Sequence, residues 1–69
     1  MKISARNVIP GTIVEIQTGA TTAHVRIDIG GGAIVTASIT NESVADLGLT
    51  VGGKAFAVVK ASDVMVAVP

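Results

Sequence analysis

Apolar and polar residues alternate along this chain in short runs, and each run ends close to a glycine. The clearest run covers residues 22–29, in which every second residue is apolar: Ala23, Val25, Ile27 and Ile29. The residues between them are Thr22, His24, Arg26 and Asp28. A repeat of two residues predicts a β-strand with one face buried and the other in solvent.

Four further segments have the length and composition of strands. Val, Ile and Thr are abundant, whereas leucine occurs only at Leu47 and Leu49. Branching at Cβ favours a pleated sheet over a helix. Pro10-Gly11 precedes the first segment and Gly30–Gly32 forms the turn after the second. The predicted strands are 12–18, 22–29, 33–40, 54–59 and 63–68. Residues 3–7 either extend the first strand or cross to a neighbouring subunit.

Residues 40–48 predict a short helix instead of a strand. Thr40 is a capping residue, Glu42 places an acid in the first turn, and Gly48 suits the left-handed end of a helix. Three strands, a helix and two strands are the order of an OB-type barrel. We therefore expect an all-β fold, a small five-stranded OB-type barrel with one short helix between strands three and four, as a single domain over residues 1–69.

The composition favours association with further copies of the chain. Among 69 residues 49% are hydrophobic, the mean hydropathy is +0.70 and cysteine is absent. No apolar run approaches the roughly 18 residues of a membrane span. A domain this small leaves little interior for such an apolar excess, because its surface is large relative to its volume. We expect a tight oligomer and no membrane partner.

The charge balance limits the classes of binding partner, and the first residues indicate the cellular compartment. Five basic residues balance five acidic ones, so bulk attraction to nucleic acid or to an anionic membrane is disfavoured. Ser4, Arg6 and Asn7 interrupt the apolar segment that a signal peptide needs. We expect a cytoplasmic protein.

Catalysis finds little support in the residues. His24 is the only histidine and falls on the polar side of its strand, so no nucleophile–base–acid set forms around it. The acids are scattered, and Gly30–Gly32 lacks the spacing of a phosphate-binding loop. Phe56 is the only aromatic residue and is expected in the core, which leaves no stacking platform for single-stranded nucleic acid. The sequence predicts no enzyme.

Three polar clusters near the ends of elements remain: residues 4–7, 40–43 and 60–63. Each has a plain structural explanation, as a strand end, a helix cap or a turn. Together they supply hydroxyl groups, backbone N–H groups at a helix start and one lysine ammonium. Neutral donors around a single point charge suit a small, nearly spherical anion, whereas a carboxylate more often recruits arginine.

The same clusters carry a resemblance to a known family. Ser4–Asn7, the helix at 40–48 with its Leu47-Gly48 end, and Lys60–Met65 together resemble the molbindin, or Mop-domain, family of molybdate-binding proteins. The resemblance covers essentially the whole chain. It implies an OB-type barrel whose N-terminal strands exchange between subunits of a homo-hexamer, a trimer of dimers. It also implies cytoplasmic binding of molybdate or tungstate between subunits, for storage and homeostasis.

The resemblance further implies the residues of the site. Ser4 and Arg6 of one subunit, within the segment that includes Ala5, face Thr40, Ser43, Lys60 and Ala61 of another. Arg6 and Ala61 act through backbone N–H, and molybdenum is held as its oxyanion with no side chain as direct metal ligand. The turn at 19–22 is a second anion site by the same likeness.

Two other functions stay open. The first is that of an interaction or regulatory module that needs a partner protein, which co-purification would identify. The second is that of an OB-type binder of single-stranded nucleic acid, which a salt-dependent mobility shift of a labelled oligonucleotide would reveal.

Overall fold

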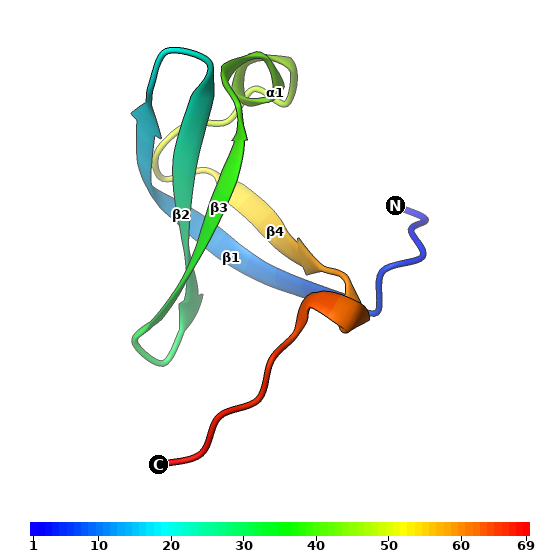
Figure 1. The fold of residues 1–69 in the computed structure, drawn as a ribbon. Helices are drawn as coiled ribbons and strands as arrows, with labels where there is room; N and C mark the ends of the chain where they lie inside the picture. The colour runs from blue at the N-terminus through cyan, green and yellow to red at the C-terminus, as the bar shows by residue number, and fades with distance from the viewer.

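One long central strand organises the fold. The computed structural model describes all residues 1–69, and its four strands form one antiparallel sheet in the order β3-β2-β1-β4 (Figure 1). The elements in chain order are β1 (Asn7–Thr18), β2 (Thr22–Gly30), β3 (Ala33–Thr40), the helix α1 (Asn41–Asp46), β4 (Lys54–Val59) and the 3₁₀ turn η1 (Ala61–Asp63).

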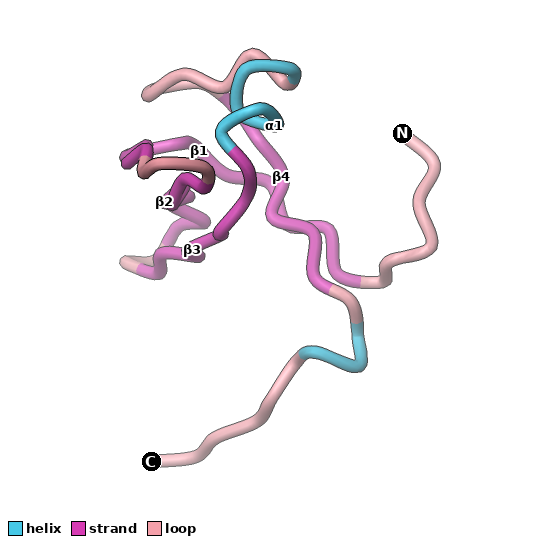
Figure 2. The backbone as a smooth tube through the Cα atoms, turned by 45° about the horizontal axis from the view of Figure 1, so that its top comes forward, coloured by secondary structure: helices cyan, strands magenta, loops and turns pink.

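The two halves of β1 pair with different neighbours. Residues 7–12 pair with β4 and residues 12–18 pair with β2, with an irregularity in the β2 pairing between Ile13 and Glu15. The sheet therefore coils, and β4 leaves the plane of β2 and β3 (Figure 2). The strand begins at Asn7, not at Thr12 as predicted. Pro10 is tolerated because that half of β1 has a neighbour on one side only.

The prediction of a fifth strand at 63–68 is wrong for the single chain. The chain turns through η1, and no pairing to the sheet follows it. Figure 1 shows the last residues running away from β4. Val64, Met65, Val66 and Val68 all stay exposed. Alternating β-formers become a strand only beside an edge that accepts their hydrogen bonds, and η1 carries this segment away from such an edge.

The core forms on the predicted face of β2. Ala23, Val25 and Ile27 are buried together with Ile13 and Ala57, and their polar neighbours on β2 are exposed. The alternation predicted for residues 22–29 is thus confirmed. The expectation for Phe56 is wrong, because Ala57 takes the inward position on β4 and the pleat turns the adjacent Phe56 outward, 55% exposed.

The predicted helix is confirmed at both ends. Thr40 caps α1, its Oγ1 accepting a hydrogen bond of 3.0 Å from the Ser43 N–H. Gly48 follows the last turn at φ +62°, a conformation that glycine adopts without steric cost. The all-β class with one short helix between the third and fourth strands holds, with a curled four-stranded sheet in place of five strands.

The chain exposes more surface than a compact monomer does. Its accessible area is 5206 Å², against about 4,000 Å² expected for a folded monomer of 6.9 kDa. Large apolar side chains contribute to this surface, among them Ile3, Leu47, Val51, Phe56 and Val58. No helix is both long and apolar enough to cross a lipid bilayer.

Candidate functional site

Two of the three polar clusters meet where β1 begins and β4 ends. Asn7 and Val59 are paired residues in the sheet, so the segment before Asn7 and the segment after Val59 leave the ladder side by side. They enclose an open hollow of about 660 Å³. Its lining residues are Ile3, Ser4, Ala5, Arg6, Val58, Lys60, Ala61, Ser62 and Asp63. Five of the seven predicted site residues therefore line one hollow of one chain.

The hollow is rich in hydrogen-bond donors. The backbone N–H groups of Arg6, Ala61 and Ser62 donate to no other group of the chain. Two carbonyl groups of the turn are already occupied, since Lys60 O accepts from the Asp63 N–H at 2.9 Å and Ala61 O from the Val64 N–H at 3.3 Å. The 3₁₀ turn thus uses acceptors locally and leaves donors available to a ligand.

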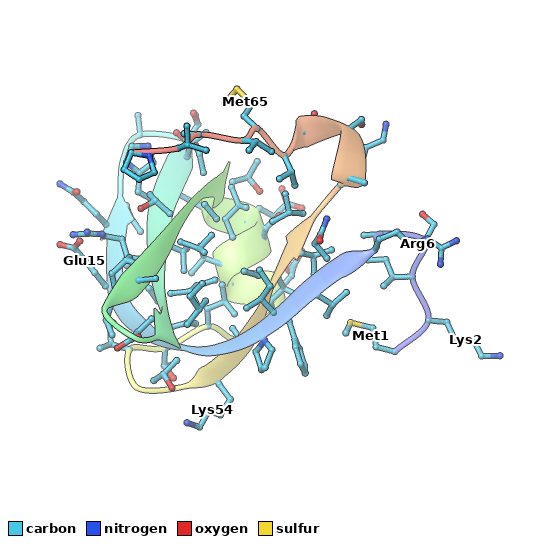
Figure 3. The ribbon with its side chains drawn as sticks, turned by 90° about the horizontal axis from the view of Figure 1, so that it is seen from below. Met1, Lys2, Arg6, Glu15, Lys54 and Met65 are labelled. Atoms are coloured by element: carbon cyan, nitrogen blue, oxygen red, sulfur yellow. The ribbon has the colours of Figure 1, made fainter.

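The charges around the hollow sum to a net positive value. Lys60 and Arg6 are exposed and neither forms a salt bridge, because the one salt bridge of the chain joins Arg26 to Glu15. Asp63 is the only acid of the lining. Figure 3 places Arg6 on the N-terminal segment where it leaves the sheet. The arrangement attracts a small anion, and its backbone donors can hold it.

Thr40 and Ser43 form a hydroxyl pair at the start of α1. The Thr40 hydroxyl donates to Ser43 Oγ at 2.8 Å, while Thr40 Oγ1 accepts from the Ser43 N–H. The Ser43 hydroxyl hydrogen is then the free donor of the pair. The Asn41 N–H donates to Thr21 O at 2.9 Å. The expectation of unpaired N–H groups at this helix start is therefore wrong for Asn41 and Ser43, since the cap and a neighbouring turn use them.

The hydroxyl pair is separate from the hollow within one chain. Thr40 and Ser43 are absent from its lining, and α1 and η1 lie at different ends of the molecule in both Figure 1 and Figure 2. One small anion therefore cannot contact both sets in the same chain. The single chain instead joins Ser4 and Arg6 to Lys60 and Ala61, which the resemblance assigns to different subunits.

The turn between β1 and β2 has a smaller hollow of about 300 Å³, lined by Gln17, Thr18, Gly19, Thr22 and His24. It contains half of the turn predicted as a second anion site. The Gly19 N–H already donates to Thr22 O at 2.7 Å, and Gly19 O accepts from Asn41 Nδ2 at 2.9 Å. The remaining polar groups are the Gln17 amide, the two threonine hydroxyls and His24, which is exposed as predicted. The second site at this turn stays a prediction.

Sequence reasoning missed the amide side chains that hold these segments. Asn7 Nδ2 donates to Val59 O at 3.1 Å, and Asn41 fixes the start of α1 to the turn at Gly19. Their position in the sequence could have identified them, because each is a short amide side chain directly beside a candidate site residue. Ser62 and Asp63, predicted only as a turn, also line the hollow. No group of three His, Cys, Asp or Glu side chains is placed to hold a metal ion.

Comparison with known proteins finds a matching family model and relatives that align over nearly the whole chain. The TOBE domain model matches residues 3–66. A probable molybdenum-pterin-binding protein of Haemophilus influenzae is 47% identical over 68 residues, which cover 99% of each chain.

Two solved structures share the fold. A molybdate-binding protein from Sporomusa ovata superimposes with a TM-score of 0.90 and 43% identity, covering 97% of this chain and 98% of its own. The cytoplasmic molybdate-binding protein ModG, crystallised with molybdate bound, gives a TM-score of 0.92 at 46% identity. That match covers all of this chain and 49% of ModG.

Proposed function

Because the chain belongs to the TOBE domain family, and within it to the molybdenum-pterin-binding proteins, we propose that it binds molybdate. The ligand is the tetrahedral oxyanion MoO₄²⁻, which presents oxygen atoms in every direction and has no planar face. Tungstate has the same shape and charge and binds in the same way. The role is binding and not catalysis, in one module that spans residues 1–69.

The hollow between the two chain ends is the observation that carries this proposal. Ser4, Arg6, Lys60 and Ala61 all line it, and the N–H groups of Arg6 and Ala61 have no partner within the chain. A dianion in such a place accepts charge-assisted hydrogen bonds, which are shorter and stronger than neutral ones. One lysine at the rim supplies charge without imposing the planar geometry of arginine.

A second copy of the chain completes the site. Thr40 and Ser43 are too far from the hollow of their own chain, so these hydroxyls reach the anion from a neighbouring subunit. The exposed apolar side chains and the excess accessible area support association, and we propose a homo-hexamer, a trimer of dimers, as the family resemblance implies. Molybdate stored at such interfaces in the cytoplasm, where ModG acts, is released for cofactor synthesis.

Titration calorimetry with sodium molybdate, in buffer free of sulfate and phosphate, tests the proposal. Lys60→Ala removes the lysine ammonium at the hollow. Lys54→Ala is the matched control at the opposite end of β4, where Lys54 Nζ contacts Thr12 Oγ1 at 3.0 Å. A hydrogen bond to a charged group contributes about 1.5–3 kcal/mol. We expect Lys60→Ala to weaken binding by that amount and Lys54→Ala to leave it unchanged. Absence of binding by wild-type protein in calorimetry and in equilibrium dialysis would refute the function.

Selectivity is measured by the same titration with sulfate. Sulfate is also a tetrahedral dianion, so the number of donors does not separate the two ligands and the size of the pocket must. We expect clearly weaker binding of sulfate, and equal affinities would contradict a site shaped for molybdate.

A further inference from the structure

Asn7 occupies the last rung that β1 and β4 share before the hollow. It is the first residue of β1 and pairs with Val59, the last residue of β4. Arg6 precedes it directly and Lys60 follows its partner directly. Any movement at this rung therefore shifts both sides of the hollow at once.

The Asn7 side chain ties the two strands together at this point. Its Nδ2 donates to Val59 O at 3.1 Å, a partly buried bond between residues 52 positions apart. Beyond this bond the segment 1–6 forms no hydrogen bond to the rest of the chain. The Asn7–Val59 amide bond is thus the last side-chain hydrogen bond before the Ser4–Arg6 segment and the Lys60–Ala61 segment leave the sheet.

Asn7 itself is not part of the lining of the hollow. An effect on ligand binding must therefore pass through Arg6, Lys60 and Ala61. Segments that are held before the ligand arrives lose less conformational entropy when it binds.

We propose that Asn7 is a positioning residue of the anion site: its amide bond to Val59 O holds the Ser4–Arg6 and Lys60–Ala61 segments at the separation that molybdate binding requires. The inference rests on the proposed function for its ligand, but not for its structural content.

Calorimetry with molybdate tests the effect on affinity. Asn7→Thr removes the amide donor while keeping a residue that favours strands, and Asn7→Ala is the second variant. Lys54→Met is the control, since it removes a side-chain hydrogen bond between the same two strands at their other end. We expect both Asn7 variants to weaken molybdate binding about fivefold to tenfold, the effect of one hydrogen bond, and the control to stay within twofold. Asn7 variants that stay within twofold of wild type would overturn the proposal.

Double variants separate positioning from a general loss of folded protein. In the Lys60→Ala background, Asn7→Thr should weaken molybdate binding less than it does in the wild-type background, because one of the groups that Asn7 positions is already gone. In the Ser43→Ala background, Asn7→Thr should weaken molybdate binding as much as it does in the wild-type background, because Ser43 lies on a different element. Equal losses in the two backgrounds would indicate a merely structural role and refute positioning.

Amide NMR order parameters of the free protein test the same inference without any ligand. In Asn7→Thr the amides of Arg6, Lys60 and Ala61 should become more mobile than in wild type, and in Lys54→Met they should not. Unchanged order parameters would overturn the positioning role. Should wild-type protein bind no molybdate, the proposed function would fail while this comparison still decides the role of Asn7.

Discussion

Gly11 is the residue whose replacement tests the packing of the fold most directly. It lies on β1 just before the strand changes partner from β4 to β2. A Cβ built on Gly11 would lie 2.5 Å from Ile27 Cγ2 and 2.7 Å from the Asp28 carbonyl oxygen. Its backbone is not in the left-handed region, so the requirement for glycine here is space and not conformation.

Gly11→Ala should destabilise the protein by about 2–3 kcal/mol, the upper part of the range for an added methyl group in a packed site. The Ile27 side chain can rotate, but the Asp28 carbonyl belongs to β2, so relief requires β1 and β2 to separate locally. A chain of 69 residues has a total stability of about 3–10 kcal/mol. The expected loss corresponds to a fall in Tm of roughly 10–20 °C.

Thermal unfolding followed by circular dichroism measures this loss, at one fixed protein concentration because subunit association contributes to Tm. Gly31→Ala is the control, since Gly31 has φ +63° and open space around it. Gly31→Ala should lower the free energy of unfolding only by the penalty for a left-handed backbone conformation, about 1–2 kcal/mol. A Gly11→Ala protein within about 0.5 kcal/mol of wild type would refute the close approach of β1 to β2.

Three further substitutions probe other parts of the molecule. Thr40→Ala removes the helix cap and the partner of the Ser43 hydroxyl, so it should cost about 1 kcal/mol in denaturant unfolding and also weaken molybdate binding in calorimetry; unchanged values of both would contradict the hydroxyl pair. Glu15→Gln breaks the 3.5 Å salt bridge to Arg26, whose partners are about half exposed, and should change the free energy of unfolding by less than about 1 kcal/mol; a larger loss would show that the bridge is less screened than its exposure indicates. Ile13→Val shortens a side chain that is 1% exposed and should lower the free energy of unfolding by about 0.5–1.5 kcal/mol. An unchanged urea midpoint would contradict this expectation.

Features that depend on neighbouring residues were accessible from the sequence. The alternation at 22–29 predicted both the strand and its buried face, because the pleat itself turns successive side chains to opposite sides. Thr40 and Gly48 predicted the two ends of the helix, because capping involves groups within one turn of each other. The polar clusters and their type of ligand also followed from local residue chemistry and from the family resemblance.

Features that depend on distant pairing were decided by the tertiary structure. Local pattern did not show that β1 starts at Asn7, because Pro10 is acceptable only where one side of the strand has no neighbour. Residues 63–68 have the composition of a strand, but η1 carries them away from the sheet, and no backbone partner is in reach. The meeting of Ser4 and Arg6 with Lys60 results from the Asn7–Val59 rung. Such contacts join residues more than fifty positions apart, and their formation depends on the coiling of the whole sheet.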